Sequence, residues 1–136
     1  ISECLVGSEM CIRDRYMEDL CKIRDVYRAI AEFETQFIQQ YNLSLNEGML
    51  LCALLDHPRL TSGEIAEELG LTHSNTSKLI RSVEEKKLIT RVVGKIDKRQ
   101  MHFSLTAEGK EQINAIKGST HEMPALLHQV ISMLEK

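Results

Sequence analysis

The chain has 136 residues, of which 43% are hydrophobic and only 4% are aromatic, and its formal net charge is −3. This length suits one domain with a proper core and is too short for two independent ones. The composition is typical of a helix-rich soluble protein. No hydrophobic run approaches the ~20 residues that a membrane-spanning helix needs, so we expect no membrane partner.

Residues 1–16 (ISECLVGSEMCIRDRY) show no helical periodicity, no helix cap and no continuous hydrophobic face, and they lack the core of a secretory signal. The tract CLVGSEMCIRDR resembles a translated sequencing adapter that occurs ahead of unrelated reading frames. Met17 then opens a segment typical of a natural protein start. We therefore expect residues 1–16 to be non-native or disordered and residues 17–136 to form the domain. The alternative is a genuine N-terminal extension.

A long amphipathic helix is predicted over residues 18–41. Its hydrophobic residues follow a rhythm of about 3.5 residues, which is the spacing of helices that pair with other helices. They include Leu20, Ile23, Tyr27, Ile30 and Phe37.

The next helix is predicted from a capping box formed by Ser44 and Glu47, and it ends before His57 and Pro58. Cys52 lies among aliphatic residues of this helix, so we expect it in the core. Residues 60–61 are expected to add a short strand to a small sheet.

A helix–turn–helix follows. Thr61 and Glu64 form a second capping box, and Gly70 can take the left-handed conformation that ends a helix. Thr72 is the expected N-cap of the second helix. Hydrophobic residues and one threonine recur there at spacings of three and four and should face the core: Thr76, Leu79, Ile80 and Val83.

The other face of the second helix carries hydroxyl, amide and basic side chains. Short polar side chains at the start of a helix can enter a major groove and bond base edges or phosphates. The residues expected to contact DNA are Thr72, His73, Ser74, Asn75, Ser77, Lys78, Arg81 and Ser82.

After Leu88 the helical spacing gives way to alternation, and two alternating runs flank residues 94–98, which predicts a β-hairpin. Its tip carries Lys95, Lys98 and Arg99, which suit a contact with phosphate or the minor groove. Residues 72–102 hold eight Lys and Arg against three Asp and Glu, a net charge of +5. Residues 17–56 hold three against seven, a net charge of −4. Positive charge is thus concentrated where the motif would meet DNA.

Two further helices are predicted. Thr106 should cap the first, which breaks at Gly118. The second covers about residues 121–135, and its hydrophobic residues repeat at heptad spacing: Met123, Leu127, Val130 and Leu134.

Residues 18–135, and most specifically 61–109, resemble the MarR family of bacterial transcriptional regulators. The resemblance rests on the helix–turn–helix and on a wing pattern, D-x-R…L-T-x-x-G, which is matched by Asp97, Arg99, Leu105, Thr106 and Gly109. It implies a mainly α fold (α+β) with a small β-hairpin wing, in which residues 45–106 form a winged helix-turn-helix. It also implies that Arg99 reaches into the minor groove and that Asp97 supports the wing.

Lys87 departs from the family pattern, which usually has glycine at the end of the recognition helix. The position often has a positive φ, which costs about 1 kcal/mol for a residue with a side chain.

The resemblance further implies a homodimer in which residues 18–41 and 121–135 of two subunits interlock. The residues expected in the dimer interface are Leu20, Ile23, Tyr27, Ile30, Leu127, Val130 and Leu134. The implied partner is a pseudo-palindromic double-stranded DNA operator, and the favoured role is that of a repressor, with an activator as the open alternative. The missing secretory signal and the DNA-binding motif indicate a reducing cytoplasm, where the cysteines are thiols. A small-molecule effector is also implied, although no residue of the sequence identifies it.

Two alternatives remain open. One is a winged-helix module for protein contact that does not bind DNA. The other is a thiol-based redox regulator that uses Cys21, near the start of the first helix.

The four cysteines show no C-x-x-C pair and no zinc-ligand spacing, and the five histidines are scattered. His73 is expected to face DNA and His102 to point outward from the wing. No phosphate loop, Ser/His/Asp set or catalytic carboxylate pair is present in the sequence, so we expect no metal, no cofactor and no enzyme activity.

Overall fold

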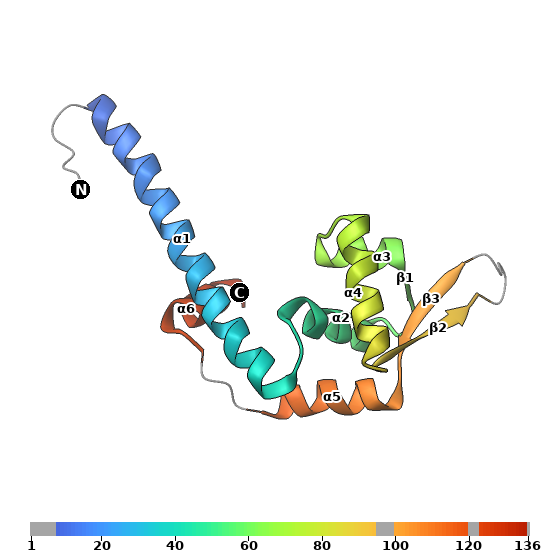
Figure 1. The fold of residues 1–136 in the computed structure, drawn as a ribbon. Coiled ribbons are helices and arrows are strands. Elements are labelled where there is room, and N and C mark those ends of the chain that lie inside the picture. Colours follow the sequence, from blue (N-terminus) through green and yellow to red (C-terminus); the bar gives the residue numbers. More distant parts are fainter. Residues whose placement is uncertain (1–7, 95–99, 120–122, 136) are drawn as a thin grey trace. The chain divides into compact units, whose positions relative to one another are not determined.

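The computed structural model describes residues 8–94, 100–119 and 123–135, with side chains from Tyr16 onward (Figure 1). The described part is mainly helical and has a small antiparallel sheet, as predicted. In chain order the elements are α1 (Ser8–Tyr41), α2 (Leu45–Asp56), β1 (Leu60–Thr61), α3 (Ser62–Leu69), α4 (His73–Glu85), β2 (Ile89–Val93), β3 (Met101–Leu105), α5 (Ala107–Gly118) and α6 (Ala125–Leu134).

The chain forms two compact units. The first joins Ile1–Gln36 to His121–Lys136, and it therefore holds most of α1 together with α6. The second, Phe37–Thr120, contains the end of α1, the helices α2 to α5 and the whole sheet. The helix–turn–helix and the wing thus belong to one unit.

The predicted start of the first helix at residue 18 is wrong, because α1 begins at Ser8. No proline or glycine follows Gly7 in this segment, and the Glu, Met and Arg residues within it are good helix formers. Extending an existing helix costs far less than nucleating a new one, so α1 continues backward from the amphipathic part. The non-native origin of residues 1–16 stays a prediction.

The last helix also differs from its predicted bounds, since it begins at Ala125 rather than near residue 121. Pro124 is its N-cap, and a proline disfavours the helical conformation in the residue before it, here Met123. Residues 120–122 lie outside the described part.

The core of the second unit is built around α2. Leu50 and Leu51 are fully buried, and they share the core with Leu43, Leu54 and Ile65. The capping box at the start of α2 is confirmed: Glu47 N donates to Ser44 Oγ at 3.2 Å, and Ser44 N donates to Glu47 Oε1 at 2.8 Å. Reciprocal bonds of this kind satisfy backbone N–H groups that the helix leaves free, so they fix where α2 begins.

The predicted short strand and hairpin are confirmed in a sheet with the order β1-β3-β2. Both pairings are antiparallel, with Leu60 opposite Phe103 and Ile89 opposite Leu105. Gly94 N donates to the Gln100 carbonyl at 3.0 Å, which closes the hairpin beyond the last strand pair. β2 and β3 of this sheet therefore form the wing, which follows α4 directly in the chain.

Candidate nucleic-acid interface

The helix–turn–helix is formed by α3, a tight turn and α4, and its predicted caps are confirmed. Thr61 caps α3 through a box with Glu64, with bonds of 2.9 and 3.2 Å. Gly70 has a φ of 67° and ends α3 in the left-handed conformation. Thr72 Oγ1 accepts a bond from Asn75 N at 3.1 Å and starts α4. Because α3 is capped at its end and α4 at its start, hydrogen bonds within the turn itself fix the direction in which α4 begins.

α4 has one buried face and one exposed face, as its spacing predicts. Thr76, Leu79, Ile80 and Val83 are buried, and Thr76 Oγ1 donates to the Thr72 carbonyl at 2.7 Å. Most of the predicted contact residues lie together on the exposed face: Thr72, His73, Ser74, Asn75, Ser77, Lys78 and Arg81. Thr72 Oγ1 is already used by the helix cap, which leaves the other side chains for an external partner.

Ser82 differs from the other residues predicted to contact DNA, and its contact with DNA stays a prediction. Its side chain is half-buried, and its Oγ donates to Glu47 Oε2 at 2.5 Å. At the end of α4 the surface turns toward α2, so a position that is polar in sequence meets a buried carboxylate and not solvent.

The end of α4 confirms the expectation for Lys87, which has a φ of 64°. Leu88 N donates to the Val83 carbonyl at 3.3 Å, and Lys87 N donates to the Glu84 carbonyl at 2.9 Å. This is the bonding pattern of a Schellman motif, in which glycine is preferred at the left-handed position. Lys87 therefore carries backbone strain at the junction between α4 and the wing.

Replacing Lys87 with glycine is expected to raise the free energy of unfolding by about 1 kcal/mol, because the strain of the left-handed lysine is relieved. Urea unfolding at one protein concentration measures the change. Lys87→Ala is the matched control, because it removes the charge but keeps the Cβ, and it should not stabilise the protein. Equal stability of the glycine and alanine variants would contradict the prediction.

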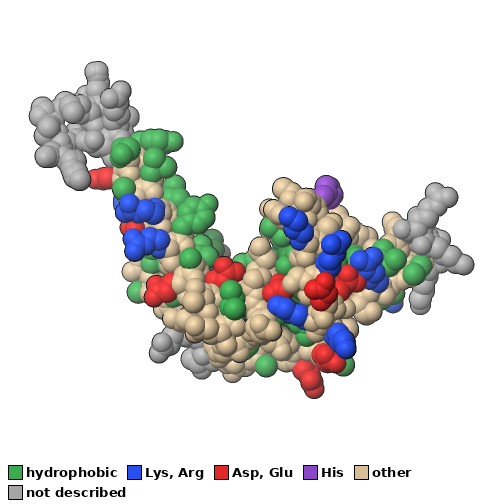
Figure 2. All heavy atoms as spheres, in the orientation of Figure 1, with side chains coloured by type: hydrophobic (Ala, Val, Ile, Leu, Met, Phe, Trp, Pro, Cys, Tyr) green, Lys and Arg blue, Asp and Glu red, His purple; other side chains and the backbone are tan. Residues whose placement is uncertain are grey.

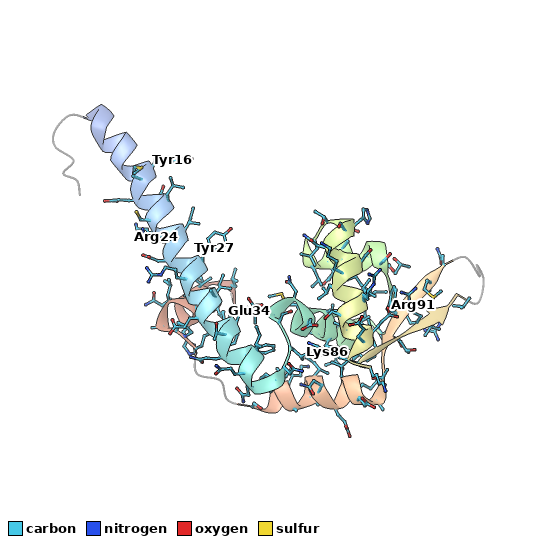
Figure 3. All side chains as sticks on the ribbon, in the orientation of Figure 1. Tyr16, Arg24, Tyr27, Glu34, Lys86 and Arg91 are labelled. Carbon is cyan, nitrogen blue, oxygen red and sulfur yellow. The ribbon has the colours of Figure 1, made fainter. Side chains whose placement is uncertain are left out.

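The base of the wing is tied to α4 by Arg91 (Figure 3). Its guanidinium donates to both carboxylate oxygens of Glu84, at 2.7 and 3.0 Å, and lies 5.4 Å from the ring centroid of Phe103. The hydrogen bonds with Glu84 raise the pKa of Arg91. A two-pronged ion pair fixes orientation as well as distance, so β2 is held at a set angle to α4.

The L-T-x-x-G part of the wing pattern lies behind the wing, where α5 meets the end of α4. Thr106 Oγ1 donates to the Lys87 carbonyl at 2.8 Å and accepts from Gly109 N at 3.0 Å, and Thr106 N donates to the Leu88 carbonyl at 3.0 Å. A Cβ on Gly109 would lie 2.1 Å from that same Leu88 oxygen. Glycine is therefore required for the close approach of α5 to the junction.

The predicted wing-tip residues Lys95, Asp97, Lys98 and Arg99 lie outside the described residues, so their roles stay predictions.

The side chain of His102, which was expected to point outward from the wing, is only partly exposed. It is half-buried on β3, and its Nδ1 atom is buried without a hydrogen-bond partner among the described residues.

Basic side chains gather over α4 and the neighbouring strands (Figure 2), although two of them serve internal contacts. Lys86 pairs with Glu47 and Arg91 with Glu84. Lys78, Arg81 and Lys87 are exposed, and no ion pair is found for them within the described ranges. Among the described residues, Lys78, Arg81 and Lys87 are therefore available to an external polyanion, at α4 and the turn that follows it, whereas Lys95, Lys98 and Arg99 lie outside the described part.

The dimer residues predicted on α1 are exposed within a single chain. Leu20 is 47% exposed, Ile23 52%, Tyr27 71% and Ile30 38%, and they continue an apolar edge that begins at Tyr16 (Figures 2 and 3). On α6, Leu127 is buried and Val130 is half-buried, whereas Leu134 is 77% exposed. The α1 stripe is therefore a hydrophobic surface that α6 leaves uncovered.

Cys52 is exposed on α2, so its predicted place in the core is wrong. The helix turns Leu51 and Ala53 inward, which leaves position 52 on the outer side together with the exposed Met49. Cys21 is also an exposed free thiol.

In the part of the chain that the structure describes, no three His, Cys, Asp or Glu side chains are placed to bind a metal, and no helix is long and apolar enough to cross a membrane.

Comparisons with known proteins agree with this geometry. The model of the MarR family matches residues 41–100. YwaE of Bacillus subtilis, named an uncharacterized HTH-type transcriptional regulator, is 27% identical over 73% of this chain and 58% of its own length. The HTH-type transcriptional regulator SarZ of Staphylococcus epidermidis is 26% identical over 60% of this chain and 55% of its own length. The chain thus spans little more than half of these two relatives.

Solved structures give the same result at the level of the fold. The S. aureus MepR–DNA complex is 30% identical, with a TM-score of 0.58, over 70% of this chain and 78% of that one. Reduced AbfR bound to DNA is 24% identical, with a TM-score of 0.66, over 76% of this chain and 77% of that one. With its helix–turn–helix, its three-stranded wing sheet and these relatives, the chain belongs to the MarR family.

Proposed function

We propose that this protein is a dimeric, sequence-specific DNA-binding regulator of transcription and that it acts as a repressor. The observation that carries the proposal is the exposed polar and basic face of α4, held by capped turns and by the Arg91–Glu84 pair. The proposal is supported by MepR, which is 30% identical and was solved with DNA. We propose that, when this protein binds DNA, α4 enters the major groove and the hairpin tip, with Lys95, Lys98 and Arg99, reaches the minor groove.

The exposed apolar stripe on α1 supports the proposed homodimer, because a second copy would remove the stripe from water. Twofold symmetry then demands a pseudo-palindromic operator with half-sites about 10 bp apart, so that both α4 helices meet the same side of the duplex. A repressor that binds the bacterial chromosome acts in the cytoplasm. A small-molecule effector stays an expectation from the family resemblance, and we propose no enzyme activity.

The competing function is a winged helix for protein contact. Selection of binding sequences from a random DNA pool, followed by gel-shift titration at two salt concentrations, separates the two. A DNA reader enriches a palindromic sequence and binds it more weakly as salt rises, because each phosphate contact releases counterions. A protein-contact module enriches no sequence and shows no difference between the selected and the random DNA.

Asn75 and Lys78 are expected to make different kinds of contact. Asn75→Ala should cost about 1–3 kcal/mol on the selected site and little on random DNA, because an amide can bond a base edge, adenine in particular. Lys78→Ala should weaken binding to both DNAs and flatten the salt slope by roughly one unit, because an ammonium pairs with phosphate. Arg99→Ala should weaken sites with AT-rich flanks most, since their minor groove is narrow. Equal loss on selected and random DNA for all three variants would refute base reading by Asn75.

A further inference from the structure

The proposed interface makes no use of Glu47, which among the described residues is the only buried side chain with a formal charge, with 5% of its surface exposed. It belongs to the capping box of α2, but a capping box does not need a buried carboxylate. Glu64 forms the same box on α3 and is exposed. The burial of Glu47 therefore calls for a second role.

Three segments of the second unit meet at this carboxylate. Oε1 accepts from Ser44 N and from Lys86 Nζ, both at 2.8 Å, and Oε2 accepts from Ser82 Oγ at 2.5 Å. Lys86 Nζ also donates to the Asn42 carbonyl at 2.8 Å (Figure 3). The turn after α1, the start of α2 and the end of α4 are thus joined through Ser82 in the last turn of α4 and through Lys86, its C-cap residue.

These bonds restrict the rotation of α4 about its axis more closely than apolar packing alone. The buried face of α4, with Leu79, Ile80 and Val83, sets how closely the helix packs, but apolar contact is non-directional. Hydrogen bonds to a carboxylate are directional and set the rotation of the helix about its axis. A side-chain tip that lies about 6 Å from the helix axis moves by roughly 1 Å when the helix rotates by about 10°. That displacement is enough to break a hydrogen bond to a base edge.

Burial alone would raise the pKa of Glu47, but the hydrogen bonds from Lys86, Ser82 and Ser44 N outweigh it and hold the pKa below its ordinary value. Glu47 is therefore ionised at neutral pH. Its contribution to stability is present there and is lost as the pH falls through the lowered pKa.

We propose that Glu47 is a positioning residue for DNA reading, which sets the rotation of α4 through Ser82 and Lys86 and thereby the aim of the exposed Asn75 and Lys78. The proposal rests on the proposed function, since it concerns the accuracy with which α4 reads a site. Glu47 itself touches no DNA. Loss of the Glu47 carboxylate should therefore reduce the difference in affinity between DNA sequences more than it reduces the affinity for DNA in general.

The test compares Glu47→Gln with Glu64→Gln in the full chain. Each substitution keeps the size of its side chain and removes the carboxylate from one capping box, but only Glu47 contacts α4. For Glu47→Gln, the ratio of affinities for selected and random DNA should fall about tenfold. Amide exchange at Lys86, Lys87 and Leu88 should quicken by about tenfold. Glu64→Gln should change neither quantity, even where both variants lose similar thermal stability.

A second substitution tests the same Lys86–Glu47 contact by changing the lysine. Lys86→Met keeps the Glu47 cap and removes the ammonium, so it should lower the affinity ratio by itself. Combined with Glu47→Gln, it should add less than its separate effect, because the two changes share the Lys86–Glu47 pair, whereas each also alters a bond of its own, Lys86 with Asn42 and Glu47 with Ser82. If Glu47→Gln failed to fold, Lys86→Met would decide the question alone.

An affinity ratio and an exchange pattern like those of Glu64→Gln would overturn the proposal and leave Glu47 a structural residue. Failure of the unmodified chain to discriminate any DNA sequence would instead refute the proposed function. In that case the exchange data alone decide whether Glu47 holds α4, and unchanged exchange at Lys86–Leu88 would refute that role too.

Discussion

Alanine in place of Gly109 is expected to lower the free energy of unfolding by about 3 kcal/mol or more, which is severe for a single methyl group. The new Cβ would lie 2.1 Å from the Leu88 carbonyl oxygen and 3.2 Å from Leu105 Cδ2. The first contact involves backbone, so no rotamer change relieves it, and the start of α5 must move. That movement would break the bonds from Thr106 to the Lys87 and Leu88 carbonyls.

The result is measured by thermal unfolding at one fixed protein concentration, where the midpoint should fall by roughly 10 °C or more. Gly118, at the other end of the same helix, is the matched control, because a Cβ there meets nothing within 4 Å. Gly118→Ala should be neutral or slightly stabilising. A Gly109→Ala midpoint within experimental error of the unmodified chain would mean that α5 can shift without loss of its contacts.

Local signals made the helix–turn–helix predictable. Each capping box, the left-handed Gly70 and the Thr72 cap depend on residues within a few positions of one another, so the sequence contains all the partners. The positive φ of Lys87 was expected from the family resemblance, because the family usually has glycine at this position. The wing strands followed from alternation, which needs no knowledge of the rest of the chain.

Features that depend on distant partners were not predictable. The bonds to Glu47 span 35 and 39 residues, and periodicity cannot show that the polar Ser82 meets a buried carboxylate. The exposure of Cys52 likewise depends on which face of α2 the other elements cover. The one available signal was that Ser82 and Lys86 lie four residues apart, on one face of α4 and beside its apolar stripe.

The dimer prediction is the other one with a large expected effect. Ile23→Asp should convert the protein from a dimer to a monomer at micromolar concentration and lower its helical content. Ile23 lies in the apolar stripe of α1 between Leu20 and Tyr27, all of which are exposed in the single chain. Twofold symmetry places each substitution in the interface twice, and each buried aspartate would lack a partner, at a cost of several kcal/mol. Val130→Asp on α6 should act in the same way.

Light scattering and gel-shift titration measure the two consequences, mass and operator affinity. A monomer reaches only one half-site at a time, so affinity for the full operator should fall by about a hundredfold or more, while weak binding to random DNA persists. Gln39→Asp is the matched control. It adds the same charge to the same helix, at an exposed position that continues the seven-residue spacing of Asp25 and Glu32, away from the stripe. A control that stayed dimeric while Ile23→Asp dissociated would locate the interface on the stripe. A well-folded monomer from the unmodified chain would refute the dimer, and with it the palindromic operator.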